Sequence, residues 1–347
     1  MIFIAKLSLW HPALGFNIFF SDIKASFSTR YTLYCKLMNG IKFCGLLIFC
    51  LIYFSCNTGP GSGKKLQPTD TIASKDIRDT LSKKNHDFIY NVKSPNHSWR
   101  LPSPLVEVSG NTWMDSNHLI LIEDLHPNLY FIRLDDKTAT LEKTVAFDSA
   151  GKEKIDIEDV TLVDNTIYAL WSHGVLFKIS DWPNKIKVER LNTGLDKKNN
   201  TEGLCYDPIT KQLLIACKDD AGVQDEKKSV KAVYQFDIKQ NKLATAPFML
   251  IHKKDFEEIT GTKLSFNPSA IAVHPITGDI YILTTRENKG LAIFSHDGVL
   301  KSYNEIDKLI MPQPEGICFS PGGKLFISSE GKQGEPGNLF EFDSQSK

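Results

Sequence analysis

Glutamates recur at similar positions in a repeated phrase of this chain. The copies carry Glu107, Glu158, Glu202 and Glu315, and Ser269 occupies the same place in the remaining copy. Carboxylates that lie close together cannot all stay ionised without a counter-charge. A divalent cation is the simplest counter-charge, and oxygen ligands favour calcium or magnesium over zinc. The pattern therefore predicts a calcium site. Glu202 and Glu315 are its first candidates, because each precedes a glycine that permits close approach of the backbone to a ligand.

A second set of polar residues follows the predicted second strands. It comprises Glu123-Asp124, Ser172-His173, Lys218-Asp219, Arg286-Glu287 and Ser329-Glu330. We expect Ser269, Glu330, Asp219 and Asp124 as additional ligands of the cation. The alternative for each repeated glutamate is that it accepts hydrogen bonds from backbone N–H groups and fixes an inner strand. The alternative for the second set is solvated loop charge.

The chain has no G-x-S-x-G, H-E-x-x-H or C-x-x-C motif, so no nucleophile motif appears in the sequence. His118 and His173 are the histidines that could serve as general bases in a channel. No basic residue stands at the positions of the repeated glutamates, which argues against a phosphate substrate. We expect Cys205, Cys217 and Cys318 to be buried apolar thiols. A Cys205–Cys217 disulfide is the alternative.

The spacing of the phrase predicts the architecture. Its copies are 51, 44, 67 and 46 residues apart, and short β-like runs alternate with turns between them. Units of about 40–50 residues with four strands each are typical of β-propellers. We predict an all-β, five-bladed propeller with four-stranded blades, because a sixth blade would have to lack the phrase. The last unit, 315–342, supplies three strands, so a strand from 87–92, together with 98–101, should close the ring.

The N-terminal segment before the strand repeats predicts that the protein is exported. The apolar run 43–54 is too short to cross a bilayer as a helix but suits a signal peptide. The phrase 51–56 resembles a bacterial lipobox, in which Cys56 would be lipidated; cleavage without lipid is the alternative. We expect residues 1–37 to be an upstream extension absent from the mature protein. Residues 38–56 would be the signal, 57–86 a flexible linker, and 87–347 the propeller domain.

Composition limits the partners. The chain has 41 acidic and 41 basic residues, so its charge gives no reason to expect nucleic acid. The partner is expected to be an unidentified protein or small molecule at one face of the propeller, with the membrane contacted through the N-terminal lipid.

The domain resembles the SdiA-regulated family of bacterial envelope propellers. The phrases that carry this resemblance are Asp156-Ile157-Glu158-Asp159, Thr201-Glu202-Gly203-Leu204, Pro268-Ser269-Ala270-Ile271 and Pro314-Glu315-Gly316-Ile317. The resemblance implies a five-bladed propeller, a bound calcium ion, distant kinship with NHL-type repeats and no established enzymatic activity. His173 departs from the acidic residue expected in its loop.

These observations favour an exported, membrane-tethered, calcium-binding propeller that serves as a binding or scaffold module of the cell envelope. Two alternatives remain open. One is a metal-dependent hydrolase of a lactone or phosphoester, with the cation at the channel mouth. The other is a purely structural lipoprotein.

Overall fold

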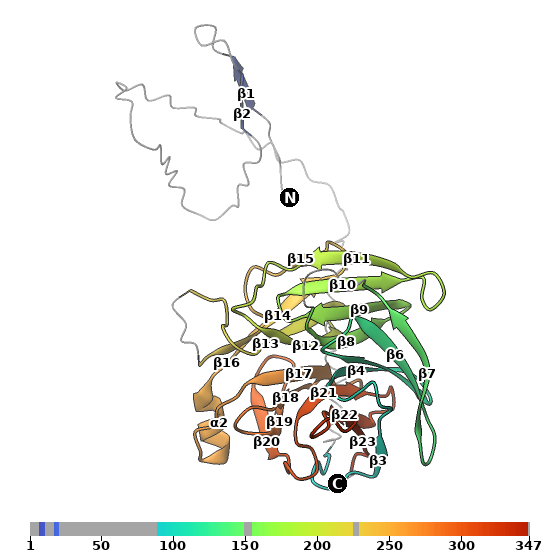
Figure 1. The fold of residues 1–347 in the computed structure, drawn as a ribbon. Coiled ribbons are helices and arrows are strands. Elements are labelled where there is room, and N and C mark those ends of the chain that lie inside the picture. Colours follow the sequence, from blue (N-terminus) through green and yellow to red (C-terminus); the bar gives the residue numbers. More distant parts are fainter. Residues whose placement is uncertain (1–6, 11–16, 21–88, 149–154, 225–228, 346–347) are drawn as a thin grey trace, which may run out of the picture. The chain divides into compact units, whose positions relative to one another are not determined.

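The computed structural model describes residues 7–10, 17–20, 89–148, 155–224 and 229–345. Five antiparallel sheets are arranged around a central axis (Figure 1). Each sheet is one blade, and its first strand lies nearest the centre. The five-bladed propeller predicted from the repeats is confirmed.

The blades follow one another along the chain. The first blade comprises β4 (Val108–Asp115), β5 (His118–Glu123), β6 (Asn128–Leu134) and β7 (Ala139–Ala146). The second comprises β8 (Ile157–Val163), β9 (Thr166–Trp171), β10 (Val175–Ser180) and β11 (Lys187–Asn192). The third comprises β12 (Thr201–Asp207), β13 (Gln212–Cys217) and β14 (Lys231–Asp237), with β15 (Lys242–Leu243) and β16 (Met249–Ile251) as a divided outer strand. The fourth blade comprises β17 (Pro268–Val273), β18 (Ile280–Thr284), β19 (Gly290–Phe294) and β20 (Leu300–Glu305). The fifth comprises β21 (Pro314–Phe319), β22 (Leu325–Ser329), β23 (Asn338–Phe342) and β3 (His97–Arg100).

Burial falls from the centre of the ring to its rim. All six residues of the inner strand β17 are buried, whereas five of the six residues of the outer strand β11 are exposed. Hydrophobic clusters fill the spaces between adjacent blades. Between the third and fourth blades, Phe256 of α2 (Lys253–Thr260) stacks on Phe266 and meets the edge of Phe294. The inner strands are therefore fixed from both sides by their neighbours.

β3 closes the ring, as was predicted from the short last unit. β3 pairs with β23, with Leu339 opposite Trp99. The segment before it contributes a single bridge between Ile89 and Gln345 rather than a blade strand. Tyr90 nonetheless packs in the core beside the last two blades. The outer strand of the fifth blade is thus the part predicted at 98–101.

Two compact units divide the chain, Met1–Gln67 and Pro68–Lys347. In the first, β1 (Leu7–Trp10) pairs with β2 (Asn17–Phe20). The second contains every strand pair of the five blades and is therefore suitable for study by itself. The predicted signal at 38–56, Cys56 and the linker at 57–86 lie outside the described residues. Within the described ranges, no helix has the length and apolar character needed to span a membrane.

Candidate functional site

Each inner strand begins with a β-bulge. At this bulge the pairing of the first two strands skips one residue of the inner strand. The skipped residues are Ser109, Glu158, Glu202, Ser269 and Glu315. A bulge leaves its extra residue outside the ladder and redirects its side chain. These five residues, which we call the bulge ring, therefore occupy equivalent places at one end of the channel. We call this end the charged mouth.

The register corrects the alignment of the first repeat. Ser109, rather than Glu107, is equivalent to Glu158. Glu107 precedes β4, and its carbonyl oxygen accepts a hydrogen bond from the backbone N–H of Asp124 at 3.3 Å. Glu107 therefore belongs to the charged mouth without being part of the bulge ring. The bulge ring holds three glutamates and two serines.

Glycines follow three residues of the bulge ring for a packing reason. A Cβ atom on Gly110 would lie 2.6 Å from Oδ1 of Asp159, and one on Gly203 would lie 3.0 Å from Ile271. A Cβ atom on Gly316 would lie 2.2 Å from Oγ of Ser328. These glycines let neighbouring strands converge at the axis, so a glycine after Glu202 or Glu315 is not itself a sign of a ligand.

Lys218 supplies a counter-charge inside the charged mouth. Its Nζ lies 2.8 Å from Oε2 of Glu202, and the side chain of Asn200 donates to Oε1 at 2.8 Å. The nearby charges of Glu202, Glu315 and Glu158 raise the pKa of Lys218 against the effect of its burial. No basic residue was expected at the bulge positions, and none is there. Lys218 instead enters from the end of β13, the second strand of its blade.

Two further basic residues lie on the same side. Arg286, just after β18, pairs with Asp219 through two nitrogens at 2.7 and 3.2 Å. Burial lowers the pKa of Lys289, although the charges of Glu315 and Glu330 oppose this effect. The third and fourth blades therefore supply the basic side chains of the charged mouth.

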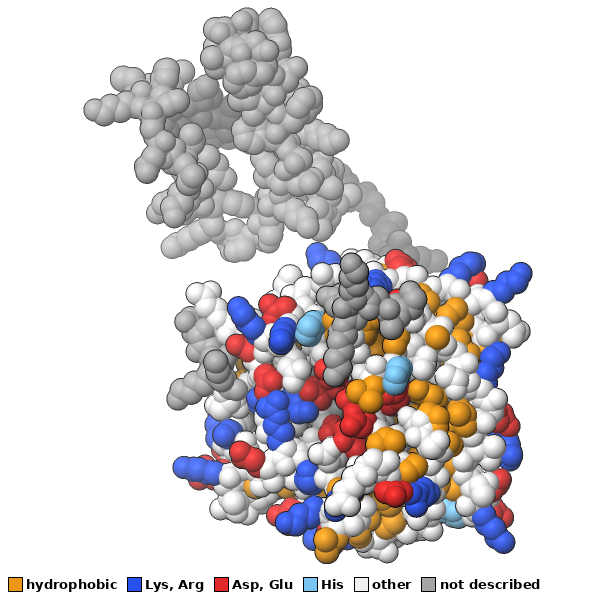
Figure 2. All heavy atoms as spheres, viewed as in Figure 1, with side chains coloured by type: hydrophobic (Ala, Val, Ile, Leu, Met, Phe, Trp, Pro, Cys, Tyr) orange, Lys and Arg blue, Asp and Glu red, His pale blue; other side chains and the backbone are white. Residues whose placement is uncertain are grey.

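The carboxylates of the fifth, first and second blades are less well compensated. We call Glu107, Asp124, Asp156 and Glu330 the acidic half. Burial raises the pKa of Asp124 to about 7, reinforced by the charge of Glu107. Burial raises the pKa of Glu330 to about 8, and the charge of Glu315 adds to this rise. Asp124 Oδ1 is buried and has no hydrogen-bond partner in the part of the chain described. Acidic side chains gather near the middle of the face shown in Figure 2.

Two glutamates of the bulge ring lie between these regions. Burial raises the pKa of Glu315 to about 7, although the Lys218 ammonium opposes the rise. Burial and the neighbouring Glu202 raise the pKa of Glu158 well above its usual range. Carboxyl groups with such pKa values hold protons near neutral pH, and they release them when a positive charge approaches.

The oxygen atoms of the charged mouth are of the kind that a hard cation binds, but they are not arranged as a coordination shell. The side chains are carboxylates and hydroxyls, the oxygen donors that calcium prefers. Over the ranges that the structure describes, no three His, Cys, Asp or Glu side chains are arranged so that they could hold a metal ion. Cation binding would therefore require some of these side chains to turn toward one another.

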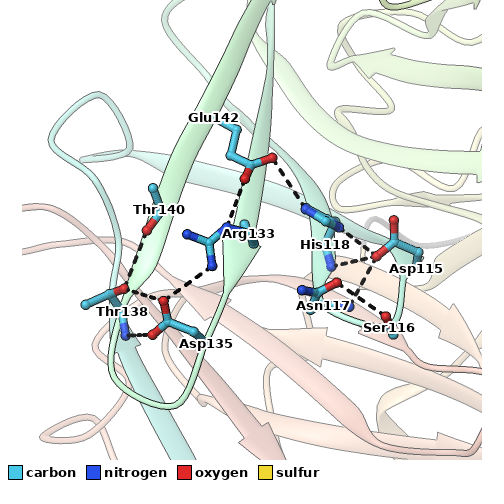
Figure 3. Close-up of polar contacts among 9 residues, drawn as sticks. All are labelled: Asp115, Ser116, Asn117, His118, Arg133, Asp135, Thr138, Thr140 and Glu142. Carbon is cyan, nitrogen blue, oxygen red and sulfur yellow. Dashed lines mark hydrogen bonds and ion pairs between the residues drawn. The ribbon is translucent and has the colours of Figure 1, made fainter.

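The two candidate histidines have other surroundings. His118 lies at the start of β5, at the opposite end of the blade from Ser109 of the bulge ring. Figure 3 shows it between Asp115, 2.7 Å from Nδ1, and Glu142, 3.4 Å from Nε2. His173 stacks on Trp171 with ring centroids 4.8 Å apart. His118 is therefore remote from the charged mouth, whereas His173 follows a second strand that ends there.

The thiols are buried, as predicted. Cys205, Cys217 and Cys318 are free, so Cys205 and Cys217 form no disulfide. Burial raises the pKa of each thiol above its ordinary value.

Comparison with known proteins supports the fold. No family model matches the chain, and no curated protein matches it in sequence. Glutaminyl cyclase from Myxococcus xanthus is similar in structure, with a TM-score of 0.51 and 15% identity over 73% of this chain and 97% of that one. A gluconolactonase from Xanthomonas campestris has a TM-score of 0.40 and 14% identity over 70% of this chain and 77% of that one. The likeness to the cyclase shows a shared fold.

Proposed function

We propose that the chain is an exported propeller that binds a cation at its charged mouth, calcium being the ion to test first, and that it serves as a binding module of the cell envelope. One observation carries this proposal: the basic side chains lie on the third and fourth blades, which leaves the acidic half without a comparable counter-charge. A cation beside these carboxylates would allow them to ionise.

The charge distribution changes the order of candidate ligands. Glu202 is engaged by Lys218 and Asn200, so it is less available than its sequence context suggested. Glu330, Asp124 and Glu107 become the leading candidates, with Glu315 next to them. Glu158, Ser269 and Asp219 are secondary, and Asp219 is already paired with Arg286.

Calorimetric titration of Pro68–Lys347 with calcium tests the proposal. We expect binding with release of protons, because the carboxyl groups lose protons as the ion approaches. The double variant Asp124→Asn with Glu330→Gln should weaken binding at least about tenfold. Asp136→Asn, at an exposed position outside the charged mouth, is the matched control. No heat of binding at millimolar calcium, or undiminished binding by the double variant, would refute the proposal.

A hydrolase acting on a lactone or phosphoester is the second candidate. The specific observation is Glu315, whose pKa of about 7 suits a general base at neutral pH, near the ammonium of Lys218. Lys218 also weakens the earlier argument against phosphate substrates. Turnover of lactones or phosphoesters with calcium present, lost in Glu315→Gln, would favour this candidate. Absence of both turnover and calcium binding would leave the structural lipoprotein.

Membrane attachment through Cys56 is a separate part of the proposal. Incorporation of radiolabelled palmitate into the full chain, and its loss in Cys56→Ala, would support lipidation. A fully labelled Cys56→Ala chain would exclude this residue as the anchor.

A further inference from the structure

The channel has a second, apolar end. The inner strands start at the charged mouth and finish around a pocket of about 290 Å³ that residues from all five of them line. Trp113, Tyr206 and Phe319 form part of its wall, together with the prolines of three turns that follow inner strands. We call it the apolar pocket. No Asp, Glu, Lys, Arg or His of the described chain lines it.

One buried polar atom in the wall of this pocket lacks a partner. Asn111 is 1% exposed, and its Nδ2 donates to Oγ of Ser328 at 2.9 Å. Its Oδ1 is buried and makes no hydrogen bond within the described residues. An unsatisfied buried acceptor costs free energy that a donor group would recover once the Asn111 side chain turns its covered Oδ1 toward the pocket. Asn111 lies two residues before Trp113 on β4, and therefore deeper in the channel.

The cysteines in the wall do not suggest covalent chemistry. Cys205 and Cys318 line the pocket, and burial raises the pKa of both thiols well above the ordinary value. Neutral buried thiols behave as small apolar groups rather than as nucleophiles. They extend the apolar wall.

We propose that the apolar pocket binds a small uncharged molecule with an aromatic or alicyclic body and one hydrogen-bond donor, which reaches Asn111. The wall provides no counter-charge, so a charged ligand would lose hydration without compensation. The volume lies near the lower end of ligand pockets, roughly 300 Å³, which suits two or three rings. This inference is independent of the cation at the charged mouth.

N-phenyl-1-naphthylamine is a suitable probe, because it is uncharged, has an apolar body and carries one N–H group. Its emission rises when it leaves water. Titration into Pro68–Lys347 should give saturable binding of one probe per chain. Leu162→Arg places a charge in the pocket wall and should weaken binding at least tenfold. Leu309→Arg makes the same change at an exposed leucine of another cavity and should have no effect.

The hydrogen bond is tested with 1-phenylnaphthalene, which has a similar shape but no donor. The wild-type protein should bind the amine several-fold more tightly than the hydrocarbon, and Asn111→Leu should remove this preference. If Asn111→Leu does not fold, the wild-type preference decides the point. Failure to bind the probe, equal loss with Leu309→Arg, or no preference for the amine in the wild-type protein would overturn the proposal.

Discussion

Lys218 and Glu202 form an ion pair with side chains 12% and 6% exposed. Removing one member of a buried pair leaves the other charge without a partner, at a cost of about 3 kcal/mol or more. We therefore predict that Lys218→Met lowers the free energy of unfolding by about 3 kcal/mol at about pH 8. The loss should be smaller at about pH 5, because Glu202 can then take up a proton. Urea unfolding at both pH values measures the difference.

The double variant Lys218→Met with Glu202→Gln is the control. It removes both charges, so it should recover much of the stability lost by the single variant. If the double variant is as unstable as Lys218→Met alone, the interaction between the two charges is not the cause of the loss.

His274 is a second buried ionisable residue, at the end of β17. Its Nδ1 lies 3.3 and 3.1 Å from the backbone nitrogens of Ile276 and Thr277, and its Nε2 lies 2.8 Å from the hydroxyl of Tyr90. Because Nδ1 accepts from N–H groups, the ring is neutral and carries its proton on Nε2. Burial, with a smaller effect of the Lys301 charge, lowers the pKa of His274 to about 4.

This low pKa predicts loss of stability in acid. Below about pH 6.5 the unfolded chain binds a proton at His274 that the folded chain excludes, so stability falls until the pH reaches the folded pKa. The loss amounts to roughly 3 kcal/mol. The stability advantage of the wild-type protein over His274→Asn should therefore shrink between about pH 7 and 4. A constant advantage over this range in urea unfolding would contradict the prediction.

At the scale of elements, the sequence predicted most inner strands but not their bulges. The copies of the phrase at 201–204 and 268–271 lie within β12 and β17. A bulge appears only when one strand is paired with another, so the alignment that made Glu107 equivalent to Glu158 was two residues out. The ion pair of Glu202 with Lys218 could not be predicted from the sequence either, because Lys218 lies at the end of the neighbouring strand.

β3 is the element that closes the ring. Trp99 is 5% exposed, and its indole nitrogen donates to the backbone oxygen of Asp135 at 2.7 Å. A chain that starts at Pro102 would lose β3 and leave the edge of β23 unpaired, and such edges associate with other strands. We predict self-association and a broader melting transition for this chain, by gel filtration and calorimetry.

The control chain starts at Phe88 and keeps β3, so it should melt as Pro68–Lys347 does. A synthetic peptide of residues 95–103 should restore the shortened chain to a monomer by adding the missing strand. A shortened chain that stays monomeric and melts sharply without the peptide would show that β3 is dispensable.

At the scale of the molecule, the regular spacing of the phrase was enough to predict five blades. The difference between the two ends of the channel could not be predicted in the same way. The charged mouth combines residues from two strands of each blade, and the apolar pocket combines one strand from every blade. Both depend on contacts between segments far apart in the chain.

The middle of the channel separates these two ends. Asp159 is 1% exposed, and its carboxyl oxygens accept hydrogen bonds from the backbone nitrogens of Val160 and Leu204 at 2.8 and 2.7 Å. Gly110 packs directly against it. Coupling between two sites requires an element with two arrangements that both ligands bias. We expect the close packing around Asp159 to hold a single arrangement.

Calcium and N-phenyl-1-naphthylamine should therefore stabilise the propeller independently. A ligand at about 100 times its dissociation constant adds about 2.7 kcal/mol to the free energy of unfolding. The two ligands together should add about 5.4 kcal/mol, and independent sites agree with the sum within about 0.5 kcal/mol. Urea unfolding with each ligand and with both measures the sum. A departure larger than about 1 kcal/mol would show that the packing around Asp159 transmits binding from one end of the channel to the other.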